Sequence, residues 1–180
     1  MKESKIAIGW KKTAKCASMT GRLLLQQLLE QEYEIFLSEK ENPIEREAGG
    51  KPFLVHHRDV YFNISHSGSY VVCAVGRVPL GIDIQYHKKG DYHRTGRRIM
   101  TPDEWEEYEK SDFSDTFFFR CWTKKESYLK YTGEGIRRDM RTLDYDTCCF
   151  HELKLWEDYS VMLCVPDTWK GKIEIYPSPF

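Results

Sequence analysis

Two short apolar runs of similar composition, residues 69–75 and 159–165, constrain the fold of this chain more than any other feature. Each run follows a helical pattern and is the second of two strand-like runs separated by a turn. Buried strands resemble one another by chance, so coincidence remains a second interpretation. If the repeat is real, it predicts two related α+β halves that meet along one interface, a common place for a ligand cleft.

The periodicity along the chain predicts one compact α+β unit. We assign residues 1–86 to the N-terminal half and residues 87–180 to the C-terminal half. A hydroxyl residue, a proline and a glutamate in Thr101-Pro102-Asp103-Glu104 predict a helix start. Alternation predicts strands over residues 5–10, 33–37, 60–64, 70–75, 80–84, 150–156, 159–165 and 172–176. Leucine spacing or apolar periodicity predicts helices over residues 15–32 and 115–132. Residues 42–50 are expected to form a loop and residues 87–98 a mobile basic connector.

Charge and hydropathy exclude several classes of protein. The 27 Lys and Arg residues are balanced by 28 Asp and Glu residues, whereas a general nucleic-acid binder needs a basic excess. No apolar run approaches the roughly 20 residues of a membrane span, and no cleavage-site pattern follows the N-terminus. The six cysteines show no Cys-x-x-Cys spacing. We therefore expect a cytoplasmic protein that binds neither nucleic acid nor membrane.

Polar residues occur in three segments where packing alone would not place them. Residues 62–68 form a strand that ends in Ser-His-Ser-Gly, where hydroxyls, an imidazole and backbone N–H groups could hold an anion. In Gly81-Ile82-Asp83-Ile84-Gln85, alternation puts Asp83 on the face opposite the two isoleucines. An ordinary polar turn and a solvent-facing aspartate remain simpler interpretations of these two segments.

The third segment, residues 122–130, is helical in pattern. Glu126 and Lys130 lie four residues apart on one face, and Lys125 lies about 100° around the helix from Glu126. An exposed pair of this kind is usually only helix support, worth roughly 0.2–0.5 kcal/mol. Together, however, the three segments supply two carboxylates, an anion-binding turn and several lysines. This combination predicts Mg²⁺-assisted chemistry on a phosphate ester.

In this order, the segments resemble the 4′-phosphopantetheinyl transferases of the surfactin type (the Sfp-like class). The matching blocks span roughly residues 15–136, about two-thirds of the chain. They are Gly50-Lys51-Pro52-Phe53, residues 62–68, residues 81–84, residues 122–130 and Gly133-Glu134-Gly135-Ile136, with weaker matches at residues 21–24, 98–101 and Glu104.

The resemblance implies two pseudosymmetric α+β halves in one monomer, with coenzyme A bound between them. It also implies the reaction. The phosphopantetheine arm of coenzyme A is transferred to a serine hydroxyl of an apo acyl or peptidyl carrier protein, and adenosine 3′,5′-bisphosphate is released. The expected cofactor is Mg²⁺, with Mn²⁺ as an alternative.

The family's functional positions carry over to this chain one by one. Asp83 and Glu126 match acids that converge on the metal, and Gln85 occupies the place of a third ligand. The catalytic residues implied are Asp83, Glu126 and Lys130, with Glu126 also helping to deprotonate the serine. The residues expected to contact coenzyme A are Lys51, Pro52, Ser65, His66, Lys125, Lys130 and Arg22, with Lys11, Lys12 and Lys15 as further candidates for its 3′-phosphate.

Two departures separate the chain from the family pattern. The family usually has a glutamate where Gln85 stands, and an amide oxygen brings no charge to the metal. The stretch between the first strand and the first helix is also short. These departures leave open a degenerate module that binds coenzyme A or a carrier protein without turnover. A third interpretation is a nucleic-acid-associated protein that uses Arg94, Arg97 and Arg98.

Overall fold

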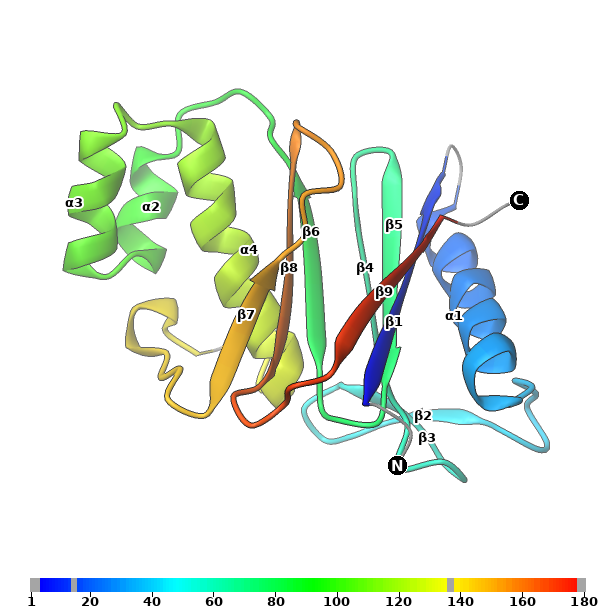
Figure 1. The fold of residues 1–180 in the computed structure, drawn as a ribbon. Helices are drawn as coiled ribbons and strands as arrows, with labels where there is room; N and C mark the ends of the chain where they lie inside the picture. The colour runs from blue at the N-terminus through cyan, green and yellow to red at the C-terminus, as the bar shows by residue number, and fades with distance from the viewer. Residues whose placement is uncertain (1–3, 14–15, 136–137, 178–180) are drawn as a thin grey trace.

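The described residues form two main sheets, which share an apolar core and carry helices on their outer faces, and one small two-stranded sheet (Figure 1). The computed structural model describes residues 4–13, 16–135 and 138–177. Helix α1 (Ala17–Tyr33) covers the outer face of the first sheet, and α4 (Asp115–Thr132) covers that of the second. The predicted α+β fold with two halves is confirmed.

The first sheet has the strand order β4-β5-β1-β9. Its strands are β1 (Lys5–Lys12), β4 (Tyr61–Ser67), β5 (Tyr70–Gly76) and β9 (Lys172–Pro177). β4 and β5 form the predicted hairpin, and β1 pairs antiparallel with β5. β9 runs parallel to β1, so residues from the C-terminal end of the chain complete the sheet of the N-terminal half.

The second sheet has the order β6-β8-β7 and is antiparallel throughout. Its strands are β6 (Gly81–Tyr86), β7 (Cys148–Glu152) and β8 (Tyr159–Pro166). Residues 1–86 therefore give β6 to the second sheet, just as residues 87–180 give β9 to the first. Each half of the molecule contains a strand from the other half of the sequence.

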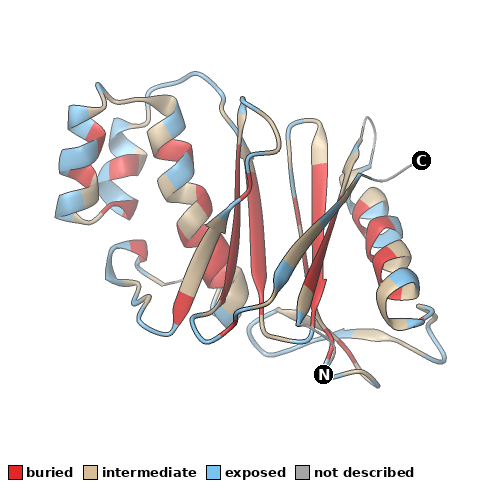
Figure 2. Cartoon of the chain, in the orientation of Figure 1, coloured by how far each residue is buried: buried red, intermediate tan, exposed pale blue. Residues whose placement is uncertain are grey.

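Alternation along the central strands divides the interior into layers. On β5, Val72 and Ala74 face the core between the sheets, and Val71 and Cys73 face α1. Figure 2 shows the same arrangement, with buried segments concentrated in the central strands and on the inner faces of the helices. Both faces of β5 are consequently buried, as its nearly continuous apolar sequence indicates.

The helix start predicted at Thr101 is confirmed. α3 (Pro102–Lys110) begins with a capping box, in which the Glu104 N–H donates to Thr101 Oγ1 at 3.2 Å and the Thr101 N–H donates to Glu104 Oε2 at 2.9 Å. α4 has the predicted bounds and ends at Gly133, whose φ of 78° suits a glycine.

Three predictions of local structure are wrong. Residues 33–37 form no strand: α1 continues to Tyr33 and ends where Glu34 adopts a φ of 57°, after which Ile35 packs in the core. The loop expected over residues 42–50 contains β2 (Ile44–Arg46), which pairs with β3 (Pro52–Leu54). The segment expected to be a mobile connector contains a helix, α2 (His93–Ile99), and burial of Ile99 stabilises it.

A 3₁₀ turn, η1 (Met140–Thr142), lies in the segment between α4 and β7. Among the helices that the structure describes, none is long and apolar enough to cross a membrane.

Gly81 allows α4 to cross β6 in direct contact with its backbone. A Cβ atom at this position would lie 2.2 Å from the Ser127 carbonyl oxygen and 2.3 Å from the Tyr131 nitrogen. Both atoms belong to the helix backbone, which cannot move aside as a side chain can. The absence of a side chain at residue 81 therefore sets the distance between the helix and the strand.

We expect Gly81→Ala to lower the free energy of unfolding by about 3 kcal/mol, because the added methyl group must push α4 away from β6. Urea denaturation measures the change. Gly90→Ala is the matched control, since a Cβ there approaches only ring atoms of Tyr92, 3.2 Å away. Equal stability of the two variants would contradict the close packing of α4 on β6.

Candidate active site

Strand β6 presents Asp83 to the second half of α4. Ile82 and Ile84 face the core between the sheets, so alternation directs Asp83 toward the helix, as the sequence predicts. Asp83 is only 2% exposed. A carboxylate at this depth is stable only when hydrogen bonds or charges compensate it.

Lys130 of α4 and Ser65 of β4 compensate the charge of Asp83. Lys130 Nζ lies 2.6 Å from Asp83 Oδ1 and donates to Ser65 Oγ at 2.7 Å. Ser65 Oγ in turn donates to Asp83 Oδ1 at 2.7 Å. The three groups form a closed triangle that connects the two sheets and the helix.

Alternate side chains of β4 also bind the backbone of β6. Asn63 Oδ1 accepts the Ile82 N–H at 3.0 Å, and Ser67 Oγ accepts the Tyr86 N–H at 3.0 Å. Between these two bonds, the Ile84 N–H donates to Ser65 Oγ at 3.4 Å. This β4–β6 ladder, made of Asn63, Ser65 and Ser67, holds Ser65 opposite Asp83.

Glu126 lies one helical turn before Lys130 and is 7% exposed. Burial, reinforced by the nearby Asp83 carboxylate and opposed by Lys130, raises the pKa of Glu126 to about 6. Its buried Oε1 has no hydrogen-bond partner among the described residues. The site therefore contains a carboxylate oxygen that the protein itself does not satisfy.

Gln85 completes the polar face of β6. Its Nε2 donates to Asp83 Oδ2 at 3.2 Å, and its Oε1 accepts from Ser67 Oγ at 3.4 Å. Asp83 and the unsatisfied Glu126 oxygen supply two carboxylates of the kind that fit Mg²⁺, which binds through one or two carboxylates and keeps other positions for water and substrate, whereas the amide oxygen of Gln85 is directed to Ser67. Within the described ranges, no group of three or more His, Cys, Asp or Glu residues is placed to hold a metal ion.

A cavity of about 230 Å³ adjoins Glu126 and Lys130 of α4. Lys51 and Pro52 form part of its wall together with Glu126 and Lys130. Lys51 Nζ donates to the Tyr131 carbonyl oxygen at 2.5 Å and to the Leu80 carbonyl oxygen at 3.3 Å, and burial lowers its pKa. The segment around Lys51 therefore closes one end of the candidate site against the last turn of α4.

His66 and Arg22 are exposed and lie away from this cavity, around the edge of β4. Phe62 and Ile64 pack in the core beneath α1, so alternation puts His66 on the same face of the strand. Arg22 follows Gly21, which packs against Ile64. A ligand that contacts both Lys130 and His66 must cross the edge strand β4. Lys11 and Lys12 lie at the end of β1, and Lys15 lies outside the described residues.

Lys125 does not line the candidate site, and the prediction that it contacts phosphates is corrected. The residue is 1% exposed, and its Nζ lies 2.7 Å from Glu104 Oε2 and 3.0 Å from the Met140 carbonyl oxygen. The 100° step between successive helical residues turns this side chain toward α3 and η1 while Glu126 faces Asp83.

Sequence reasoning missed the structural role of Asn63 and Ser67. Both residues belong to the Asn-Ile-Ser-His-Ser segment and alternate with Ser65. Three polar residues at every second position of a strand indicate that this face meets polar groups rather than an apolar core. That alternation was a usable signal for the β4–β6 ladder.

Comparison with known proteins identifies the family of the chain. Residues 79–162 match a family model described as the 4′-phosphopantetheinyl transferase superfamily, and residues 3–77 match one described as 4′-phosphopantetheinyl transferase, N-terminal. The chain belongs to the 4′-phosphopantetheinyl transferase superfamily.

Individual relatives are similar over most of the chain. The 4′-phosphopantetheinyl transferase gsp of Aneurinibacillus migulanus is 31% identical over 165 residues, which cover 82% of this chain and 67% of the relative. The transferase Sfp of Bacillus subtilis strain 168 is 28% identical over 84% of this chain and 63% of its own length. The mouse L-aminoadipate-semialdehyde dehydrogenase-phosphopantetheinyl transferase is 31% identical over 72% of this chain and 46% of its own length. The chain thus spans about half to two-thirds of these relatives.

We expect Glu126→Gln to stabilise the protein in the absence of metal by about 2 kcal/mol near pH 8, because the raised pKa of Glu126 means that its ionised form is destabilising. In the unfolded chain the Glu126 carboxyl has its ordinary pKa, so it loses its proton at a lower pH there than in the folded protein. The stability of the wild-type protein therefore falls as the pH rises through about 6, and the gain from Gln disappears below about pH 4.5.

Urea denaturation at pH 4.5, 6 and 8 in a chelating buffer measures this difference. Glu109→Gln serves as a control, since Glu109 is an exposed acid on α3. If Glu126→Gln raised the free energy of unfolding by the same amount at all three pH values, the ionisation of Glu126 would not be the source of the added stability.

Proposed function

We propose that this protein transfers the 4′-phosphopantetheine group of coenzyme A to a serine hydroxyl of an apo acyl or peptidyl carrier protein, with Mg²⁺ as cofactor. The observation that carries the proposal is the meeting of Asp83, Glu126 and Lys130. A buried acid of β6 and an acid and a lysine of α4 come together beside a cavity. Membership in the transferase superfamily supports the same reaction class.

Asp83, Glu126 and the Gln85 amide oxygen would hold the Mg²⁺ ion, with Mn²⁺ as an alternative. When bound, a divalent cation neutralises diphosphate oxygens and makes the phosphorus more electrophilic. The unsatisfied Glu126 oxygen is the feature of this chain that best fits such a ligand. Gln85 lies next to Asp83 but brings no charge, so we expect the metal to be held less tightly than by three acids.

The protein's own residues then act on the serine and the diphosphate. The serine oxygen forms a bond to the phosphorus on the pantetheine side of the diphosphate. The bond from that phosphorus to the bridging oxygen breaks, which releases adenosine 3′,5′-bisphosphate. Glu126 accepts the serine proton directly or through water, and its raised pKa suits it to this role near neutral pH. Metal binding lowers the basicity of the same carboxylate, so the two roles compete.

Lys130 supplies positive charge where negative charge develops on the leaving diphosphate. In the free protein this ammonium is paired with Asp83 and Ser65. We propose that coenzyme A extends from the cavity beside Lys51 and Pro52, passes Lys130 and crosses β4 to reach His66 and Arg22. Lys51, Pro52 and Lys130 line the cavity, whereas His66 lies on the other side of β4, the side toward α1. A ligand that contacts all of these residues must therefore pass over β4.

We propose that the protein acts as a monomer, as its resemblance to the family implies. No pair of its six cysteines has Cys-x-x-Cys spacing, and we propose a reducing compartment for the protein. We therefore place the activity in the cytoplasm.

The direct test mixes the protein with Mg²⁺, fluorescent coenzyme A and an apo carrier protein, and detects label on the carrier. We expect Glu126→Ala and Lys130→Ala each to reduce kcat by about 100-fold or more, because each removes a group that acts on the reacting atoms. Glu109→Ala, which removes an exposed acid of α3, is expected to retain the wild-type rate. Full labelling by Glu126→Ala would refute the role of that residue. Binding of coenzyme A without label on any carrier would instead support a binding module.

We expect Gln85→Glu to lower the Mg²⁺ concentration that gives half-maximal rate, because it adds a charged oxygen ligand beside Asp83. Initial rates across a Mg²⁺ titration at fixed coenzyme A measure the effect. Gln31→Glu, on α1 and away from β6, is the control for the added negative charge. An unchanged or higher requirement would mean that Gln85 does not face the metal.

A further inference from the structure

Lys125 carries a positive charge into the interior of the protein, one residue before Glu126. The residue is 1% exposed, and it is among the largest fully buried side chains of the molecule. An ammonium group at such depth is strongly destabilising unless it is paired and hydrogen-bonded. The reaction proposed above makes no use of it.

The ammonium group of Lys125 contacts two oxygen atoms from different segments of the chain. Lys125 Nζ lies 2.7 Å from Glu104 Oε2 at the start of α3, and it donates to the Met140 carbonyl oxygen of η1 at 3.0 Å. Glu104 Oε2 also accepts the Thr101 N–H of the capping box. A single carboxylate therefore caps α3 and pairs with α4, and one side chain of α4 fixes the position of two other segments.

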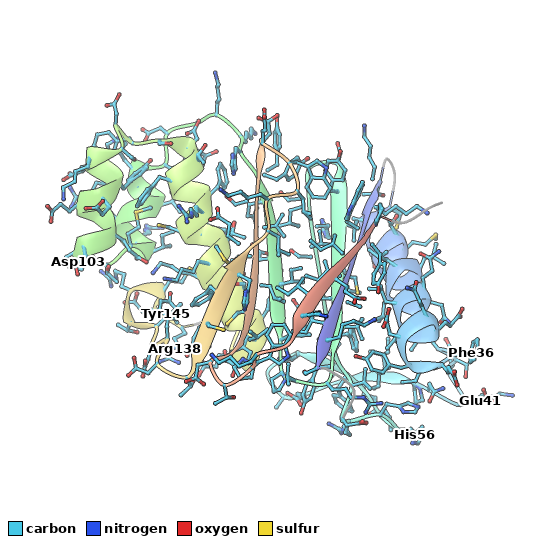
Figure 3. All side chains as sticks on the ribbon, viewed as in Figure 1. Phe36, Glu41, His56, Asp103, Arg138 and Tyr145 are labelled. Atoms are coloured by element: carbon cyan, nitrogen blue, oxygen red, sulfur yellow. The ribbon has the colours of Figure 1, made fainter. Side chains whose placement is uncertain are left out.

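The residues that follow α4 contribute both to the wall of the candidate site and to the contact with Lys125. Gly133 and Gly135 line the cavity beside Glu126, and Met140 is tied to Lys125. Figure 3 labels Arg138 and Tyr145, which both lie in the segment that joins α4 to β7. Lys125 therefore ties Met140 to the helix that carries Glu126 and Lys130.

The same contact also fixes the rotation of α4 about its axis. Lys125 and Glu126 point about 100° apart, so a helix anchored through Lys125 has little freedom to turn Glu126 away from Asp83. A displacement of about 1 Å at a reacting group can reduce a rate by about 100-fold.

We propose that Lys125 is a positioning residue: its contacts with Glu104 and Met140 hold α4 and the segment after it so that Glu126 and Lys130 face Asp83. This inference rests on the proposed function for its effect on catalysis, but the anchoring itself does not. It assigns to Lys125 a role other than phosphate contact.

The test uses the double variant Lys125→Met with Glu104→Gln. The amide oxygen that Glu104→Gln introduces can still accept the Thr101 N–H, so the capping box is kept, and no unpaired charge remains buried. Lys125→Met alone is the comparison in which Glu104 loses its partner. Arg120→Met is the matched control, because it removes a different ion pair of α4, the one between Arg120 and Glu152 at 2.8 Å.

Hydrogen–deuterium exchange tests the anchoring directly. We expect faster exchange in the second half of α4 and in residues 138–143 of the double variant, and no change in these regions of Arg120→Met. Wild-type exchange in the double variant would overturn the proposal, whether or not the protein is active.

Kinetics and thermal unfolding then separate positioning from a purely structural role. We expect the double variant to regain most of the Tm lost in Lys125→Met but to keep a kcat about 10-fold or more below wild type, with a smaller change in the KM for coenzyme A. If kcat recovers together with Tm, Lys125 only stabilises the fold and the proposal is wrong. If the wild-type protein itself produces no holo carrier, the proposed function fails, and the exchange result still decides the anchoring.

Discussion

Hydrogen bonds from side chains of β4 to the backbone of β6 join the two sheets where their edges meet. Each of these strands has a neighbour on only one side, so its remaining N–H and C=O groups need other partners. Asn63, Ser65 and Ser67 accept the N–H groups of three alternate residues of β6. A one-residue shift of either strand would turn these side chains away, so the ladder fixes the register that sets Ser65 against Asp83.

The site built on this ladder leaves one of its two acids uncompensated. Asp83 has Lys130, Ser65 and Gln85 as partners, whereas an oxygen of Glu126 has none among the described residues. The electrostatic cost is thus concentrated on the residue proposed to bind metal and accept a proton. Locally unfavourable arrangements of this kind are typical of functional sites, and the close packing of α4 on Gly81 maintains this one.

Local patterns in the sequence predicted the parts of the structure that depend on neighbouring residues. The capping box at Thr101, the bounds of α4 and the position of Asp83 on the face opposite Ile82 and Ile84 follow from residue types at short spacing. The pairing of β9 with β1 could not be predicted in this way, because alternation does not encode which strand lies beside another. The direction of Lys125 could not be predicted either: helical spacing places it 100° from Glu126 but does not say which side of α4 meets α3.

The substitution of an amide at residue 85 changes how metal and substrate depend on each other under the proposed function. Before any ligand binds, Asp83 and Lys130 neutralise each other, and Glu126 is the only remaining acid among the residues proposed to hold the ion. Such a site attracts a divalent cation weakly by itself. The diphosphate of coenzyme A carries negative oxygens of its own and would supply the missing ligands. The ion and coenzyme A should consequently bind more tightly together than either does alone, and by thermodynamic linkage each must raise the affinity for the other by the same factor.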